Sequence, residues 1–320
     1  MKITTKKDAV NRRSRFAGRQ PTGKKIVLTN RDFAYFAPLE RHGPLPSNYL
    51  FAFTKHIARN YKYHQQRLTE LYNEDNTPHR GFYLERPEQQ FASINARYQP
   101  MAYALTEAGS LALRQNAIPR QMWEPPNGPY LHRFMTACSS ASIELACLTL
   151  GLKYLSQADI FAHPKCPIDP RDTDHPLALP CGDGVIIPDQ LFAIDYGGKF
   201  RFFVLECDRK TETIVSTKAI SKSFAAKLKR YAYVLEHQTF RAAWGIPSLT
   251  ILILTVSKPH TQSLVTVTAH RTYHIHWFLY RIYIRSTVRS TICSTVRSRT
   301  RTYTSFTTSI CYCGVRTCGS

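Results

Sequence analysis

Apolar positions at helical spacing predict three helices near the start of the chain. A capping box formed by Thr29 and Asp32 marks the start of the first helix, and Gly43 marks its end. A second, short helix is predicted from Ser47, and a third over residues 61–73. Ordered structure is therefore expected to begin at about residue 28.

The third predicted helix has an apolar face and a polar face. Its candidate core residues are Tyr63, Leu68, Leu71 and Tyr72. The other face carries Lys62, His64, Gln65, Arg67 and Thr69. Contacts with DNA bases and phosphates require polar and basic side chains of this kind.

Two short strands are predicted next, over residues 81–84 and 101–105, and the polar loop between them carries Arg86 and Arg97. Three helices followed by a two-stranded wing is the order of a winged helix-turn-helix, whose third helix enters the major groove. We therefore expect residues 28–115 to bind double-stranded DNA. The predicted contact residues are Lys62, His64, Gln65, Arg67, Arg86 and Arg97. The alternatives are a polar face that meets only water and a wing used for protein contacts.

A second domain is predicted over residues 131–256, after a linker over 116–130 that is rich in proline. It begins with a helix over 132–155 that carries Glu144 inside an apolar run. The later elements are expected to be an edge strand at 159–162, a polar loop over 163–183, a hairpin, a helix over 218–237 and a buried strand over 248–256. This order predicts a compact α/β domain.

The hairpin is predicted by two apolar runs on either side of Gly197-Gly198. Asp189 lies early in the first run, and Glu206 and Asp208 lie near the end of the second. Residues two apart in a strand point to the same face, and strand pairing would bring Asp189 near these acids. Converging carboxylates are common ligands of Mg²⁺ or Mn²⁺. A hairpin with acids exposed at its ends is the alternative.

The formal net charge is +21, and most of it lies at the two ends of the chain. Residues 1–27 are expected to form a disordered basic arm. Residues 257–320 contain no acid and are rich in Ser, Thr and Arg. We expect them to be a disordered, low-complexity tail, and their composition suggests translation out of frame.

This charge balance favours an anionic partner, with nucleic acid ahead of a membrane surface. The sequence contains no visible secretory signal and no apolar run of bilayer-spanning length. A cytoplasmic protein without a membrane partner is therefore expected.

A series of short motifs resembles the replication-relaxation family. They are Ala102-Tyr-Ala-Leu-Thr-Glu-Ala-Gly109, Ile187-Pro-Asp189, Val204-Leu-Glu-Cys-Asp-Arg209 and Lys229-Arg-Tyr231. The resemblance covers roughly residues 28–255. It implies a bacterial protein linked to plasmid or mobile-element replication, DNA relaxation or mobilisation. The implied partners are double-stranded DNA and replication or mobilisation proteins.

The second domain is also similar to PD-(D/E)xK nucleases, which implies a restriction-endonuclease-like fold. By this likeness Glu144, Asp189 and Glu206 are the catalytic acids, and Asp189 and Glu206 would hold Mg²⁺ or Mn²⁺. The nuclease pattern has a lysine two residues after the glutamate, where this chain has Asp208. Lys210 lies two residues further on and would share the same strand face. This departure from the nuclease pattern bears on whether the domain cleaves DNA, and less on whether it has the nuclease fold.

The chain is therefore expected to be an α+β protein with a winged helix-turn-helix, a restriction-endonuclease-like α/β domain and a disordered basic tail. Its expected role is DNA binding in plasmid or mobile-element replication, relaxation or mobilisation. A metal-dependent DNA endonuclease and a winged-helix transcriptional regulator are the alternatives.

Overall fold

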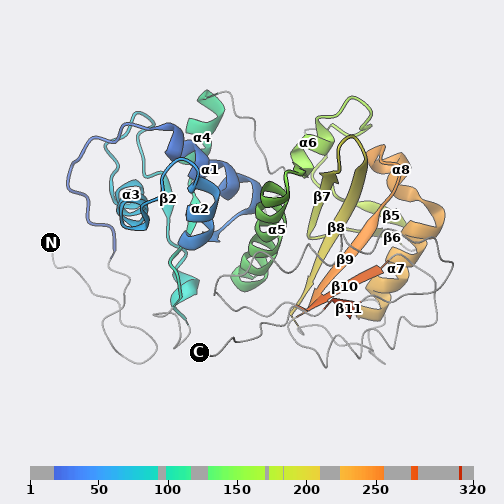
Figure 1. Cartoon of the computed structure of the whole chain (residues 1–320). Coiled ribbons are helices and arrows are strands. Elements are labelled where there is room, and N and C mark those ends of the chain that lie inside the picture. The colour runs from blue at the N-terminus through green and yellow to red at the C-terminus, as the bar shows by residue number, and fades with distance from the viewer. Residues whose placement is uncertain are drawn as a thin grey trace, which may run out of the picture. The chain divides into compact units, whose positions relative to one another are not determined.

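The computed structural model of the chain describes residues 18–92, 99–116, 129–169, 173–182, 184–209, 224–255, 275–279 and 310–311. The chain divides into two compact units, Met1–Ala141 and Ser142–Ser320 (Figure 1). The boundary lies inside helix α5 (Tyr130–Leu150). Most of the expected linker lies outside the described residues. None of the described helices combines the length and apolar character that crossing a bilayer requires.

The first unit combines helices with a small antiparallel sheet. In chain order its elements are α1 (Asn30–His42), β1 (Leu45–Pro46), α2 (Ser47–Thr54), α3 (Tyr61–Asn73), β2 (Leu84–Glu85), the 3-10 helix η1 (Glu88–Phe91), β3 (Ala102–Leu105) and α4 (Glu107–Gln115). Strand β3 is central and pairs antiparallel with both β1 and β2. The bounds of α3 are those that the apolar spacing predicted.

Side-chain hydrogen bonds explain where these helices begin. Thr29 and Asp32 form the predicted capping box of α1. The Asn60 side chain accepts hydrogen bonds from two backbone N–H groups in the first turn of α3. The Thr106 hydroxyl accepts one hydrogen bond, from the Gly109 N–H in the first turn of α4. Each cap satisfies N–H groups that have no partner within their own helix.

The core of the first unit draws apolar side chains from several elements. Fully buried side chains include Tyr35, Phe36, Leu45, Leu50, Leu68, Leu71, Tyr83 and Leu84. Burial of one large apolar side chain stabilises the fold by about 1.5–3 kcal/mol. The helices and the sheet are therefore held together mainly by this shared core.

Residues 18–27 are ordered, so the expectation of disorder over the whole of 1–27 is wrong. Ile26 is fully buried, and its N–H donates to the carbonyl oxygen of Asn76 at 3.0 Å. We call residues 18–27 the strap. Composition could not reveal this order, because the acidic residues that bind the strap lie far along the chain, on α3 and directly after it. Residues 1–17 lie outside the described residues.

The second unit is built on a mixed six-stranded sheet in the order β11-β10-β9-β8-β7-β4. In chain order its elements after α5 are β4 (Lys153–Ser156), α6 (Gln157–Phe161), β5 (Leu179–Cys181), β6 (Gly184–Ile186), β7 (Gln190–Asp195), β8 (Phe200–Asp208), α7 (Phe224–His237), α8 (Thr239–Trp244), β9 (Thr250–Thr255), β10 (Ile275–Leu279) and β11 (Ile310–Cys311). Strands β4, β7 and β8 are antiparallel neighbours, and β8 to β11 run parallel. Helices α7 and α8 lie beside the small β5–β6 sheet (Figure 1).

The predicted hairpin is present as β7 and β8. Their register places Gln190 opposite Leu205. Gly197 and Gly198 form the turn with φ values of 75° and 87°, a backbone conformation that favours glycine. The double glycine therefore fixes the register that aligns the two strands.

Strand β9 is buried, as its continuous apolar run predicted, and Ile251 is fully buried. The same sheet extends into the expected tail, since β10 pairs with β9 and places Ile275 opposite Ile251. The disorder prediction is therefore wrong at 275–279 and 310–311. An apolar run such as Ile-His-Trp-Phe-Leu can add to a sheet even when the surrounding composition is polar. Most of 257–320 lies outside the described residues.

Two local predictions in the second unit are also wrong. Residues 159–162 were expected as an edge strand, but Ser156 and Asp159 form a capping box that starts α6 there. The preceding residues form β4, where α5 was expected to continue. Part of the expected polar loop over 163–183 forms β5, which pairs with β6.

Candidate functional site

His64 of α3 lies in the core of the first unit rather than on its surface. It is fully buried, with Nδ1 3.0 Å from the Tyr35 hydroxyl and Nε2 2.8 Å from the Ser47 carbonyl oxygen. Burial lowers the pKa of His64 to about 4, although the Ser47 carbonyl opposes this shift. The prediction that His64 faces DNA is wrong. Tyr63, predicted in the core, is 61% exposed instead.

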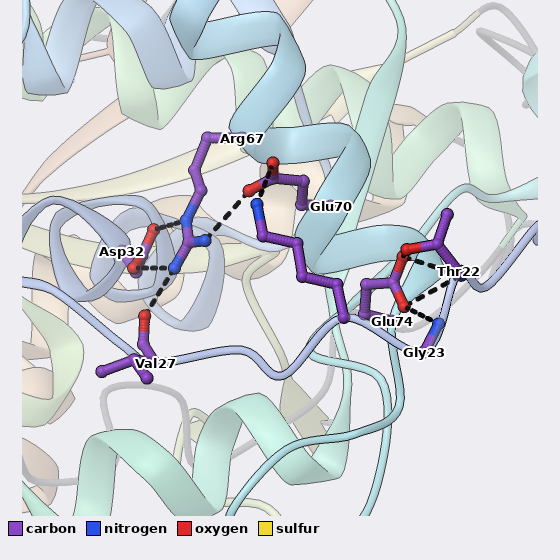
Figure 2. A network of polar contacts seen from close by, with 8 residues as sticks. Thr22, Gly23, Val27, Asp32, Arg67, Glu70 and Glu74 are labelled. Atoms are coloured by element: carbon purple, nitrogen blue, oxygen red, sulfur yellow. Dashed lines mark hydrogen bonds and ion pairs between the residues drawn. The ribbon is translucent and has the colours of Figure 1, made fainter.

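Arg67, another predicted DNA contact, is an internal ion-pair residue (Figure 2). Its Nε and Nη2 donate to the two carboxylate oxygens of Asp32, at 2.9 and 2.7 Å. Nη1 donates to Glu70 at 3.0 Å, and Nη2 also donates to the Val27 carbonyl oxygen at 2.7 Å. The hydrogen bond to Asp32 is the main cause that raises the pKa of Arg67. The expectation that Arg67 is available to DNA is wrong, because two carboxylates already compensate its charge.

The exposed residues around the start of α3 form a basic surface. Lys62 and Gln65, both predicted contacts, are exposed. The turn before α3 adds exposed Lys55, His56 and Arg59, which the sequence analysis did not single out. Their position just before the predicted third helix was the signal that could have identified them. We call these five residues the α3 surface.

Arg86 follows β2 and is fixed beside α3. Its Nη2 donates to the Thr69 hydroxyl at 3.3 Å and to the Tyr103 hydroxyl at 3.0 Å. Its Cζ lies 4.1 Å from the centroid of the Tyr72 ring. Its role as a DNA contact stays a prediction, and Arg97 lies outside the described residues.

In the second unit the hairpin brings Asp189 next to Glu206. The backbone N–H of Cys207 donates to Asp189 Oδ2 at 2.7 Å, which holds the Asp189 carboxylate against β8. Glu206 is 1% exposed, and Asp208, two residues further along β8, is 6% exposed. The alternative of acids exposed at the ends of a hairpin therefore does not apply to Glu206 and Asp208.

Two residues of α7 reach Glu206 inside the second unit. Lys227 Nζ lies 2.5 Å from Oε2, and the Tyr231 hydroxyl donates to Oε1. Burial raises the pKa of Glu206 to about 7; the Asp189 charge adds to this rise, whereas Lys227 and Tyr231 oppose it. Neither Lys227 nor Tyr231 was predicted to belong to the site. Their four-residue spacing, which puts both on one helix face, was the available signal.

The remaining predicted catalytic residues are distributed differently. Glu144 on α5 is buried, at 8% exposed. Asp208 lies opposite Thr255 of β9. Lys210 lies outside the described residues. Catalytic roles for Glu144, Asp189, Glu206, Asp208 and Lys210 stay predictions.

The acidic site does not fit a divalent metal ion in this arrangement. Tyr231 and Lys227 engage the two carboxylate oxygens of Glu206. In the part of the chain that the structure describes, no three His, Cys, Asp or Glu side chains lie close enough to hold a metal. Binding of Mg²⁺ or Mn²⁺ at Asp189 and Glu206 stays a prediction, and it requires Lys227 and Tyr231 to release Glu206.

The motifs that suggested a family can now be placed in both units. No curated protein and no solved structure matches the chain. A family model described as replication-relaxation matches residues 36–249, which is more than half of the chain. The match runs from α1 through α3 and includes the hairpin acids and α7. The chain therefore belongs to the replication-relaxation family.

Proposed function

We propose that the protein binds double-stranded DNA in plasmid or mobile-element replication, relaxation or mobilisation. In this proposal the first unit is a winged helix-turn-helix, with α3 in the major groove and β2–β3 as the wing. Membership of the replication-relaxation family supports the process. The element order α1-β1-α2-α3-β2-β3, with β3 paired to both other strands, supports the fold assignment.

The α3 surface is the observation that carries this proposal. Its basic residues are exposed, and Lys55, Arg59 and Lys62 form no ion pair with another residue that the structure describes. Phosphates are attracted to positive charge that no neighbouring acid compensates. Gln65 adds an exposed amide, which can donate to and accept from base edges. The surface thus offers both phosphate contacts and base contacts.

Fluorescence anisotropy with a labelled duplex tests the proposal on the full chain. Lys62→Ala and Arg59→Ala should each remove about one phosphate contact. Each should reduce the slope of log K against log salt by about 0.9, which corresponds to roughly eightfold weaker binding at 0.1 M salt.

Lys199→Ala is the matched control, because Lys199 is an exposed lysine at the β7–β8 turn of the other unit. It should leave the affinity and the salt slope unchanged. If the Lys62 and Arg59 variants fold normally but bind duplex with wild-type affinity, the assignment of α3 as the DNA-binding helix is rejected.

A metal-dependent DNA endonuclease is the second candidate, favoured by the proximity of Asp189 to Glu206. The engagement of Glu206 by Lys227 and Tyr231 counts against it. Supercoiled plasmid incubated with the protein and Mg²⁺ or Mn²⁺ separates the two candidates. Nicking that disappears in Asp189→Ala would support the nuclease, whereas binding without nicking would leave the DNA-binding function alone.

A further inference from the structure

Two arginines of the first unit stack on the same tyrosine. Arg19 of the strap has its Cζ 4.4 Å from the centroid of the Tyr72 ring and 3.9 Å from that of Phe82. Arg86 has its Cζ 4.1 Å from the Tyr72 centroid and 5.1 Å from that of Tyr103. Stacking on rings restricts both guanidinium groups, so their positions are set before any ligand arrives. We call Arg19 and Arg86 the arginine pair.

Neither member of the arginine pair forms an ion pair with another described residue. Arg19 Nη1 donates to the Tyr72 carbonyl oxygen, and Arg86 donates to the neutral hydroxyls of Thr69 and Tyr103. Arg86 Nε is buried and has no hydrogen-bond partner among the described residues. Since each guanidinium carries five N–H donors, the pair keeps donors for a further acceptor.

Arg67 shows the opposite situation in the same unit. Two carboxylates, those of Asp32 and Glu70, compensate its charge. The arginine pair instead holds two like charges close together. Burial is the main cause that lowers the pKa of Arg19; the Arg86 charge acts in the same direction, while Tyr72 and Glu85 oppose it. An added anion would relieve the repulsion within the pair.

The strap fixes Arg19 at the end of α3. Glu74 accepts hydrogen bonds from the Thr22 N–H at 3.0 Å, the Thr22 hydroxyl at 2.9 Å and the Gly23 N–H at 3.1 Å (Figure 2). Arg86 is tied to α3 through Thr69, one turn after Gln65 of the α3 surface. The pair therefore lies beside the polar side of α3.

We propose that Arg19 and Arg86 form a binding site for the phosphodiester backbone of DNA, beside the C-terminal part of α3. The inference rests on the proposed DNA-binding function and extends it to the strap. Guanidinium groups suit phosphate because their planar fork of donors matches two phosphate oxygens. The half-buried positions leave part of each group accessible while the rings and neutral acceptors hold it in place.

Inorganic phosphate provides a test that does not depend on DNA. Calorimetric titration of the full chain at constant ionic strength should show saturable binding to the wild-type protein. Arg19→Gln and Arg86→Gln should each weaken it roughly tenfold or more, because a charge-assisted hydrogen bond is lost. Arg80→Gln removes an exposed arginine of the same unit and should bind like the wild type.

The salt dependence of duplex DNA binding provides the second test. Each Gln variant should reduce the slope of log K against log salt by about 0.9, and the double variant by about twice as much. Arg19→Lys and Arg86→Lys keep the charge and should restore most of the slope. A purely structural stack would not show this rescue.

The outcomes separate the site from the proposed function. Phosphate binding that both Gln variants lose, in a protein that does not bind duplex, would retain the site and reject DNA as its ligand. Duplex binding with unchanged slopes in folded variants would overturn the phosphodiester site and retain the DNA-binding function. If the variants fail to fold, hydrogen exchange of the wild-type strap decides: millimolar phosphate should slow exchange of its amides, and no slowing would overturn the proposal.

Discussion

Each unit contains a buried carboxylate paired with a cation from a helix, but the two pairs differ in how completely the charges are compensated. Asp32 is fully buried and receives two hydrogen bonds from Arg67, while its Oδ2 also accepts from Thr29 in the capping box. Glu206 is equally buried, but it meets one lysine and one tyrosine and lies near a second acid. Burial therefore raises the pKa of Glu206 to about 7.

This difference separates a structural pair from a candidate site. Asp32 and Arg67 join α1 to α3, so the full pairing of their charges stabilises the first unit. Glu206 is held near the point at which it gains or loses a proton at neutral pH, and perturbed acids of this kind cluster at functional sites. The arginine pair is also incompletely compensated, but its charges are positive.

Breaking the Asp32–Arg67 pair should have the largest effect. Arg67→Ala leaves Asp32 buried without its cation, and loss of one partner from a buried pair costs about 3–5 kcal/mol. Urea unfolding of the full chain, followed by circular dichroism, measures this loss, and hydrogen exchange assigns it to the first unit. Lys24→Ala is the control, because its pair with Glu70 is more exposed and should cost less than about 1 kcal/mol. Equal losses in the two variants would contradict the structural role of Arg67.

His64 should make the first unit sensitive to acid. Its pKa is about 4 in the folded protein and 6.5 ordinarily, so the folded state binds fewer protons between these values. Stability should be complete above pH 6.5 and fall by up to about 3 kcal/mol as the pH drops towards 4. His64→Gln should flatten this dependence in urea titrations across that range. His56→Gln, at an exposed position, should leave it unchanged; the same slope in both variants would assign the effect to another group.

Release of the strap should have a smaller and more local effect. Glu74→Gln removes the charge that accepts the N–H groups of Thr22 and Gly23, at a cost of about 1–2 kcal/mol. Amide exchange in the strap should become roughly tenfold faster, while exchange in the core of α3 changes little. Exchange of the Ile26 amide, which is bonded to Asn76, is the most direct readout. Unaltered strap exchange would mean that apolar contacts alone hold the segment.

Neutralising Glu206 should have the smallest effect on the free energy of unfolding. It also gives the most direct comparison between Glu206 and Asp32. A group with a pKa of about 7 is already half protonated at neutral pH, so Glu206→Gln should stay within about 1 kcal/mol of the wild type. Asp32→Asn, the matched change in the first unit, should cost several times more. Urea titrations at pH 7 compare the two directly. A large loss in Glu206→Gln would place Glu206 with the structural pairs.

Local signals predicted some elements of the fold and their bounds. The spacing of apolar residues predicted the bounds of α3, and the double glycine predicted the β7–β8 turn. The orientation of α3 was not predictable in the same way, because Tyr63 and His64 are adjacent and both are amphipathic. His64 is the inward residue because Tyr35 and Ser47, from other elements, supply its hydrogen-bond partners.

Charge patterning did not predict which part of the basic N-terminal segment is ordered. The basic composition of the first residues predicted an unfolded arm, yet Glu70 of α3 and Glu74, which directly follows α3, bind part of it as the strap. Likewise, Lys227 was not predicted to belong to the site, and only the tertiary structure brings α7 and Lys227 to Glu206. In both cases the acid is distant in sequence and close in space.

The sequence by itself determined the family, the bounds of α3 and the approach of Asp189 to Glu206 across the β7–β8 hairpin, because each depends on neighbours in the chain or on simple strand pairing. The tertiary structure alone decided which charges are compensated. Arg67 is neutralised while the arginine pair is not, and Glu206 is paired with Lys227 of α7. The state of a charge depends on burial and on partners from other elements, and neither is encoded in the residues beside it.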